Sequence, residues 1–316
     1  DLKKGALETD IKSLKKAARQ TIGPKLEKRI QSIIDTGLIE LKEDFKIYWD
    51  NFPIAKLLTG TDYLNPNFEL IIDDIIENNP KQKLNLYISK WISSKINSVL
   101  KSLIDLKNIK ENNSSIKALA YQLYENNGVL KREQVSEYLK GLEQNERKIL
   151  RELGVKFGRY HVFLYQLIKP EAVSLRTLLW KNFHQKNYNF KPPTFGLNFL
   201  DDKENNNKNF MLLCGFEKFD NFFVRIDILE RLFMSIINSS SEKNNEIKII
   251  PEMLNLLGCS KDNFKKLLIK MNYKVFEKEN ETYFKYNPVK KFKKFPSKKI
   301  NNENPFKILK NLNLNK

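Results

Sequence analysis

The chain has 316 residues, of which 41% are hydrophobic, so it is long enough to bury two or three hydrophobic cores. Its 56 Lys and Arg residues against 38 Asp and Glu give a net charge of +18, which favours polyanionic partners such as RNA or DNA. An alternative is that biased composition alone explains this charge. No apolar run approaches the ~18 residues that cross a bilayer, so we expect a cytoplasmic protein without a membrane partner.

Two cysteines and two histidines limit the chemistry that the chain can carry. Cys214 and Cys259 lie in apolar stretches without CxxC spacing, so we expect two buried free thiols in a reducing compartment. Zinc requires three or four close ligands, and the sequence has no such cluster around His161 or His184. His161 lies in an alternating apolar stretch and is expected to be structural.

Residues 1–110 are predicted to form a first domain of helices and a small β-meander. Apolar residues at helical spacing predict helices over 7–20, 24–34 and 80–106. Short apolar runs separated by polar turns predict strands over 38–41, 45–49 and 54–58. Residues 111–190 are predicted to be a helical domain with one extended stretch at 160–164. Residues 191–209 contain two adjacent prolines and a polar, Asn-rich run, so they are predicted to be a linker.

Residues 210–286 are predicted to form a third domain with the order strand, helix, helix, helix, hairpin. Asp227 is expected to cap the first helix, and Ser260 the last one. Two helices separated by a Gly-Cys-Ser turn and followed by a hairpin over 273–286 are typical of a winged helix-turn-helix. Residues 287–316 carry nine Lys against one Glu and few apolar residues, so they are expected to be a disordered basic tail.

The expected fold class is therefore mainly α with small β elements (α+β), in several domains, with a helical bundle followed by a winged-helix-like domain. The eleven glycines never form the phosphate-cradling loop of nucleotide hydrolases, and the metal-binding carboxylates of helicase motors are absent from the sequence. We assign no catalytic residue and no metal ligand, and we expect no cofactor in this chain.

Lysines on the last predicted helix and in the tail are the candidates for nucleic-acid contact. They are Lys261, Lys265, Lys266, Lys270, Lys290, Lys291, Lys293 and Lys294. Lysines contact phosphates, which provides affinity without sequence choice. The alternative for the helix is an ordinary solvated face.

Residues 154–164 read GVKFGRYHVFL, residues 167–170 read LIKP, and residues 175–180 read LRTLLW. This pattern resembles the region C-terminal to the motor in alphaproteobacterial DExH-box helicases related to the mitochondrial degradosome RNA helicase. Shorter similar stretches extend the resemblance over most of residues 7–286, and residues 154–170 are its most specific part.

In that family the motor couples ATP hydrolysis to the unwinding of RNA. The resemblance implies that this chain, which begins at Asp1, is an RNA-binding accessory region cut away from its motor, with ATP and Mg²⁺ bound only by the motor. It implies RNA and the motor domains as partners, with DNA as an alternative to RNA and a ribonuclease of RNA degradation as a further partner. It also makes Lys156, Arg159 and Lys169 candidates for RNA contact.

Two other hypotheses remain open. The first is a stand-alone winged-helix DNA-binding regulator, which needs side chains that read base edges on the recognition helix. Asn263 is the only clear reader there, so phosphate binding is favoured over sequence reading. The second is a structural protein-interaction module, for which the basic charge is incidental.

Overall fold

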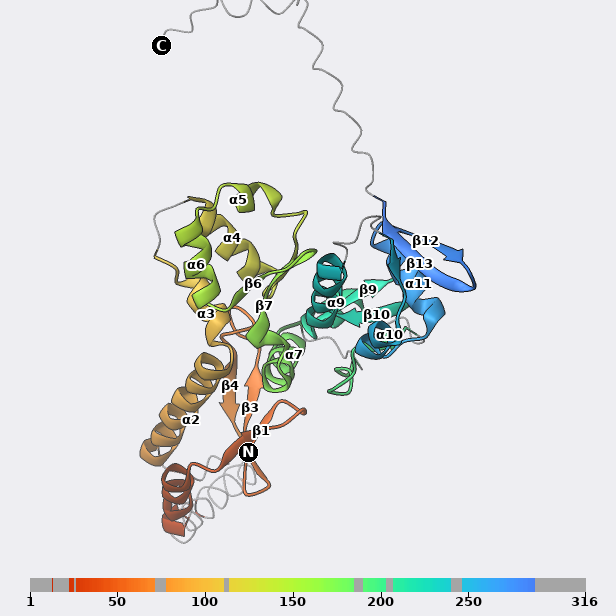
Figure 1. Ribbon diagram of the computed structural model, residues 1–316. Coiled ribbons are helices and arrows are strands. Elements are labelled where there is room, and N and C mark those ends of the chain that lie inside the picture. The colour runs from red at the N-terminus through yellow and green to blue at the C-terminus, as the bar shows by residue number, and fades with distance from the viewer. Residues whose placement is uncertain are drawn as a thin grey trace, which may run out of the picture. The chain divides into compact units, whose positions relative to one another are not determined.

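The computed structural model describes residues 13, 23–25, 27–71, 78–110, 114–184, 190–202, 207–239 and 246–287. It contains two compact units, and each combines helix with short antiparallel strands, so the fold is α+β (Figure 1). Unit 1 comprises Asp1–Asn238 and Pro251–Cys259, and unit 2 comprises Ser239–Ile250 and Ser260–Lys316. Of the predicted helix over 7–20, all but Ser13 lies outside the described residues, as does the predicted tail from residue 288 onward.

The helices of unit 1 alternate with three small sheets. Its helical segments are residues 27–36, α2 (Asn78–Val99), α3 (Lys101–Lys107), α4 (Ser114–Glu125), α5 (Ser136–Lys140), α6 (Gln144–Glu152), the 3₁₀ turn η1 (Tyr165–Ile168), α7 (Pro170–His184), α8 (Lys208–Leu213), α9 (Ile226–Ser239) and α10 (Pro251–Leu257). Its strands are β1 (Ile39–Leu41), β2 (Lys46–Trp49), β3 (Phe52–Leu58), β4 (Asn67–Leu70), β5 (Val129–Lys131), β6 (Val155–Phe157), β7 (His161–Leu164), β8 (Phe199–Asp201), β9 (Phe216–Phe219) and β10 (Phe222–Arg225). Among the described residues, no helix is long and apolar enough to span a membrane.

Strands β1, β2, β3 and β4 form the predicted meander, extended by one strand that the sequence analysis did not anticipate. The turn between β2 and β3 is the dipeptide Asp50–Asn51, and both residues have positive φ angles, of 46° and 64°. Two consecutive residues in the left-handed region match the right-handed twist of a hairpin, and Asp and Asn tolerate that region well. The predicted pairing of the first two strands is confirmed.

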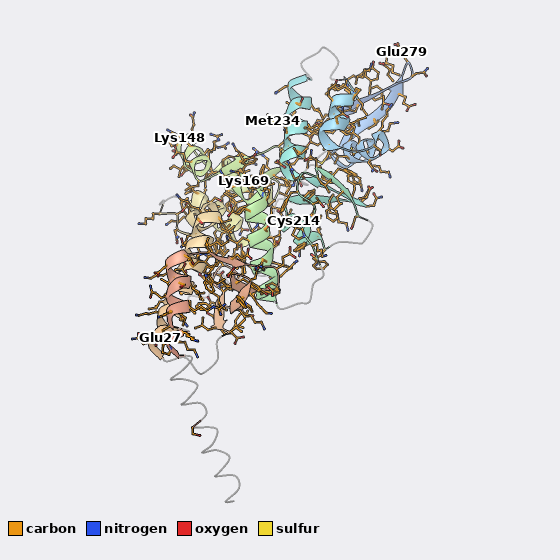
Figure 2. The ribbon with its side chains drawn as sticks, turned by 90° about the horizontal axis from the view of Figure 1, so that it is seen from below. Glu27, Lys148, Lys169, Cys214, Met234 and Glu279 are labelled. Carbon is orange, nitrogen blue, oxygen red and sulfur yellow. The ribbon has the colours of Figure 1, made fainter. Side chains whose placement is uncertain are left out.

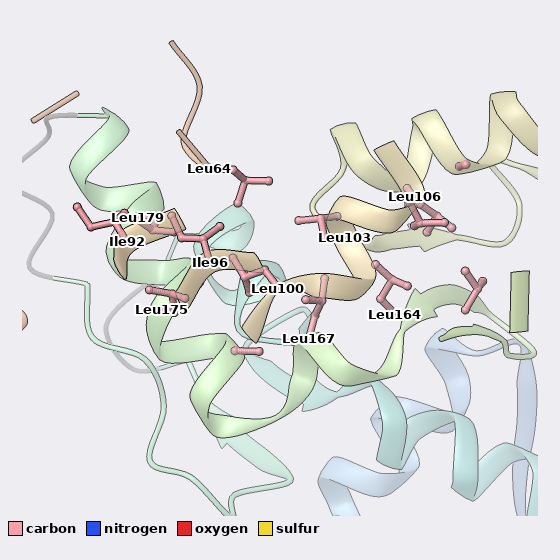
Figure 3. Close-up of a cluster of buried hydrophobic side chains, with 14 of the residues drawn as sticks. Leu64, Ile92, Ile96, Leu100, Leu103, Leu106, Leu164, Leu167, Leu175 and Leu179 are labelled. Carbon is pink, nitrogen blue, oxygen red and sulfur yellow. The ribbon is translucent and has the colours of Figure 1, made fainter. Parts of the chain in front are cut away.

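A single apolar cluster joins the meander to α2, α3, α4 and α7 (Figure 3). The sequence predicted one helix over 80–106, and that prediction is wrong at one residue. Leu100 has φ −105° and ψ 22°, which separates α2 from α3. Its side chain is fully buried in the cluster with Leu103 and Leu167, so the break redirects the chain and keeps the apolar stripe facing inward.

Residues 111–190 contain a three-stranded antiparallel sheet in the order β5-β7-β6, so the prediction of a helical domain with one extended stretch is wrong. All four residues of β7 are buried, because strands flank both its edges and other elements cover its faces. Strands β5 and β6 have only three residues each, which is too short to show an alternating pattern.

The third sheet of unit 1 has the order β8-β10-β9. Its edge strand β8 lies inside the stretch that the sequence predicted to be a linker, where Phe199 pairs with Val224. The prediction that Asp227 caps a helix is also wrong. Helix α9 already begins at Ile226, and the Asp227 carboxylate accepts hydrogen bonds from Arg225, at 2.7 Å from Nε and 3.2 Å from Nη2.

Unit 2 consists of β11 (Ile247–Lys248), α11 (Lys261–Lys270), β12 (Tyr273–Lys278) and β13 (Glu281–Tyr286), with the strand order β11-β13-β12. The predicted cap of α11 is confirmed, because the Ser260 hydroxyl accepts a hydrogen bond from the Asn263 amide. The predicted hairpin is confirmed too. Its turn residues Glu279 (Figure 2) and Asn280 have φ angles of 52° and 63°, as a two-residue hairpin turn requires.

A substitution at Leu100 tests how far the stability of unit 1 depends on the residue that separates α2 from α3. Leu100→Ala should lower the free energy of unfolding by about 2–5 kcal/mol, because it leaves a cavity at a fully buried site. All three tryptophans belong to unit 1, so their fluorescence during urea unfolding reports on this unit. Leu86, which is 63% exposed on α2, provides the control, and Leu86→Ala should change stability by less than about 0.5 kcal/mol. Equal effects of the two substitutions would contradict the core position of Leu100.

Candidate nucleic-acid interface

Helix α11 presents lysines to solvent and buries its opposite side. Phe264, Leu267 and Leu268 are buried, while Lys261, Lys266 and Lys270 are exposed. The Phe264 ring packs edge-on against Phe284 of β13, with ring centroids 6.4 Å apart, so the helix is held against the sheet by its apolar side. The lysine side chains are therefore carried on a fixed support.

Lys265 is less exposed than the other three lysines of the helix. Its Nζ lies 3.1 Å from Oε1 of Glu277 on β12, and the lysine side chain is 28% exposed. This ion pair neutralises the charge of Lys265 within unit 2. The sequence grouped Lys265 with the phosphate-contacting residues, and the structure gives it an intramolecular partner.

The remaining predicted contact residues lie apart from α11 in the sequence. Lys156 is exposed on β6, Arg159 is exposed in the turn between β6 and β7, and Lys169 is exposed immediately before α7 (Figure 2). These three residues belong to unit 1. The predicted tail residues Lys290, Lys291, Lys293 and Lys294 lie outside the described residues.

A buried carboxylate holds the turn that carries Arg159. Glu230 of α9 accepts backbone N–H groups from Arg159, from Tyr160 at 2.9 Å and from His161 at 2.7 Å. The carboxylate lies so close to the chain that a Cβ atom at Gly158 would overlap it, which explains the glycine at this position. The Arg159 side chain is exposed on a turn whose backbone is fixed.

His161 lies between Glu230 and a second buried carboxylate. Its Nδ1 lies 3.1 Å from Glu230 Oε1, and its Nε2 lies 3.6 Å from Glu217 Oε2. Lys131 of β5 reaches the other oxygen of Glu217, with an Nζ–Oε1 distance of 2.6 Å. The four side chains form a network, which we call the His161 network, and its members come from β5, β7, β9 and α9. His161, Glu217 and Glu230 are buried, whereas Lys131 is exposed.

Opposite charges shift the pKa values inside the His161 network. Burial alone would lower the pKa of His161, but its contacts with Glu217 and Glu230 outweigh burial, and the pKa is raised above its ordinary value. Burial alone would raise the pKa of Glu217, but His161 and Lys131 outweigh it, and that pKa is lowered. Protonated His161 beside ionised Glu217 is therefore the stable state at mildly acidic pH.

Arg176 of α7 is a fully buried cation with partners on three segments. Its guanidinium donates to the carbonyl of Asn127 at 2.6 Å, of Leu167 at 3.1 Å and of Leu213. Burial lowers the pKa of Arg176 to about 10, and the group stays protonated at neutral pH. Its Nε atom has no hydrogen-bond partner. The sequence analysis predicted neither the role of Arg176 nor the partners of His161, because most of these partners lie tens of residues away.

The cysteines offer no nucleophile at neutral pH. Burial raises the pKa of Cys214 to about 12 and that of Cys259 to about 11, so both stay thiols. Cys214 is buried as predicted, whereas Cys259 is partly exposed, so the prediction of two buried thiols is wrong for Cys259. Within the described part of the chain, no group of three or more His, Cys, Asp or Glu side chains is arranged to hold a metal ion.

The chain was compared with known proteins at three levels. It matches no protein-family model, no curated protein and no solved structure.

The His161 network predicts a defined pH dependence of stability. A histidine with a raised folded-state pKa stabilises fully below its unfolded pKa of about 6.5 and loses this contribution as pH rises through its folded pKa. Glu217, with a lowered folded-state pKa, contributes above about pH 4.5 and loses it as pH falls through its folded pKa. His161→Gln should therefore cost most, about 3 kcal/mol, between about pH 4.5 and 6.5.

This cost should shrink as the pH rises above that window, and urea unfolding followed by tryptophan fluorescence from pH 4.5 to 9 measures it. His184, which is exposed at the end of α7, provides the control, and His184→Gln should barely change stability. A cost for His161→Gln that grows toward pH 9 would contradict the charged state assigned to His161.

Arg176 predicts a large loss of stability upon truncation. Arg176→Met should lower the free energy of unfolding by about 3–5 kcal/mol, because three carbonyls lose a charged donor. Arg176→Lys should not restore it, since one ammonium group lacks the planar fork that reaches all three. Arg147 donates to Leu139 and Leu142 carbonyls from a partly exposed position, so Arg147→Met should cost about 1 kcal/mol at most. Equal losses at both arginines would refute the special role of Arg176.

Proposed function

We propose that this chain is an RNA-binding accessory region of an ATP-dependent RNA helicase, and that α11 supplies a phosphate-binding surface. The observation that carries the proposal is the exposure of Lys261, Lys266 and Lys270 on a helix whose other side is anchored in the core of unit 2. Lysines on a fixed helix can follow the phosphates of a polyanion without reading its bases. The net charge of +18 supports long-range attraction to the same partner.

The order of the elements supports a winged-helix-like arrangement for this region. Along the chain, α10 and α11 are followed by the β12–β13 hairpin, and β11 pairs with the β13 edge of that hairpin. In the proposal, α11 takes the position of the helix that faces nucleic acid in helix-turn-helix proteins. The hairpin takes the position of the wing.

The chemistry of α11 favours phosphate contact over base reading. The helix has no arginine or glutamine, and Asn263 is its only side chain of the base-reading type. The exposed side also carries Ile269, which is 59% exposed, and an apolar side chain adds no hydrogen bond to a base edge. A sequence-specific DNA regulator is therefore disfavoured.

The resemblance of residues 154–180 to helicase accessory regions supports a motor as the second partner. The exposed Lys156, Arg159 and Lys169 of unit 1 flank the buried residues of that stretch and are available to RNA beside the motor. The proposal assigns ATP hydrolysis to the motor and binding to this chain.

The salt dependence of RNA binding tests the proposal. Replacing Lys261, Lys266 and Lys270 together with Gln should weaken binding to a labelled single-stranded RNA. The slope of log affinity against log salt concentration should flatten by about 2, because three phosphate contacts each contribute about 0.7. Fluorescence anisotropy at several salt concentrations measures both quantities.

A matched triple variant separates position from net charge. Lys83, Lys90 and Lys101 are exposed lysines of unit 1, and their replacement by Gln removes the same charge. This control should change the slope much less. Identical slopes for the two triple variants would refute α11 as the binding surface, and wild-type affinity independent of salt would favour a protein-interaction module.

A further inference from the structure

The sheet of unit 2 has a second face, which the sequence analysis did not consider. In β12 and β13 the register pairs Lys274 with Lys285, Phe276 with Tyr283, and Lys278 with Glu281. Lys248 of β11 lies beside Tyr283 in the same row. Because side chains alternate along a strand, these seven residues share one face of the sheet, which we call the outer face.

The opposite face of the same sheet is the packed one. Tyr273, Thr282 and Phe284 are buried there, and Phe284 meets the ring of Phe264 from α11. Helix α11 therefore occupies the side of the sheet away from Phe276 and Tyr283. Among the described residues of unit 2, strand side chains form the outer face.

Two aromatic rings are stacked at the centre of the outer face. Phe276 and Tyr283 have ring centroids 6.2 Å apart and ring planes within 18° of parallel, and both side chains are only partly buried. Nearly parallel rings on an open sheet form a platform for planar groups. Every nucleobase has such a planar face, and stacking on aromatic side chains is worth about 1–3 kcal/mol per base.

Lysines surround the two rings. Lys274 and Lys285 are both exposed and directly opposite each other in the register, an arrangement that is unfavourable for like charges. Lys248 is paired with Glu281, which also accepts a hydrogen bond from the Tyr283 hydroxyl at 3.2 Å. Glu281 is the only carboxylate among the strand residues of this face, against four lysines. A bound phosphate between Lys274 and Lys285 would relieve their repulsion.

We propose that the outer face binds single-stranded RNA, with one or two unpaired bases stacked on Phe276 and Tyr283 and the backbone phosphates on Lys274 and Lys285. This inference rests on the proposed RNA-binding function and adds a substrate class to it. Bases inside a duplex are already stacked and paired, so they cannot lie on protein rings without melting. The outer face therefore selects unpaired RNA, whereas the lysines of α11 contact phosphates of either form.

The test compares two RNA probes bound by the full chain, a fluorescein-labelled 12-nucleotide oligouridylate and a labelled, blunt-ended 12-base-pair RNA duplex. The main variant replaces Phe276 and Tyr283 together with Leu, which keeps apolar volume on the strands and removes both aromatic faces. We expect at least about a tenfold loss of affinity for the oligouridylate, from the stacking energy of one base, and less than a twofold change for the duplex.

Tyr286 provides a matched control on the same strand. It is 43% exposed but lies on the opposite face, where its ring contacts Tyr273. Tyr286→Leu should leave the preference for single-stranded RNA unchanged. Phe276→Trp, which enlarges the aromatic face, should retain or strengthen binding, and its added tryptophan fluorescence should be quenched by oligouridylate.

Each outcome decides between the two proposals. Wild-type affinity in the double Leu variant, or an equal loss for both probes, would overturn the stacking platform while the proposed RNA-binding function stands. Binding of neither probe by the wild-type chain would overturn the proposed function itself. If the double Leu variant fails to fold by circular dichroism, the Phe276→Trp variant decides, since unquenched fluorescence at saturating oligouridylate excludes stacking at this site.

Discussion

The buried guanidinium of Arg176 sets where three turns of unit 1 must lie. Its hydrogen bonds end on the carbonyls of Asn127 after α4, Leu167 in η1 and Leu213 at the end of α8. Carbonyls at the ends of helical segments lack intrahelical partners, so one cation satisfies three of them at once. Because an unsolvated charge is costly in an apolar core, the three turns and α7 are constrained together. The bond to Leu213 joins residues on both sides of the predicted linker.

The buried Glu230 carboxylate likewise constrains a turn of unit 1, the turn between β6 and β7. It binds three consecutive amides of the β6–β7 turn from α9, and it faces His161 at the end of that turn. The most specific stretch of the resemblance, residues 154–170, therefore contains a glycine and a histidine whose environment is explained by packing alone. The candidate RNA contacts Lys156 and Arg159 gain a rigid support from it, since the turn cannot move without breaking these bonds.

Local signals in the sequence predicted the elements that local physics determines. The Ser260 cap and the β12–β13 hairpin each have a signature within a few residues, and each is present. Strands β5 and β8, which have three residues each, have no such signature and were missed. The contact between His161 and Glu230 spans 69 residues, so it depends on the tertiary fold. The candidate lysines of α11 were predictable, but the partner of Lys265 was not.

The two proposed surfaces of unit 2 lie on different sides of one sheet. In the proposal, affinity for any RNA and preference for single-stranded RNA therefore depend on different residues. Helix α11 packs through Phe264 on the face of the sheet opposite the outer face, and Phe276 and Tyr283 occupy the outer face. A rigid duplex that follows the α11 lysines offers no unpaired base to the rings. A flexible single strand can contact the lysines and still turn its bases onto the outer face. If both proposals hold, lysine substitutions on α11 should change affinity for any RNA, whereas ring substitutions should change the ratio of single-stranded to duplex affinity.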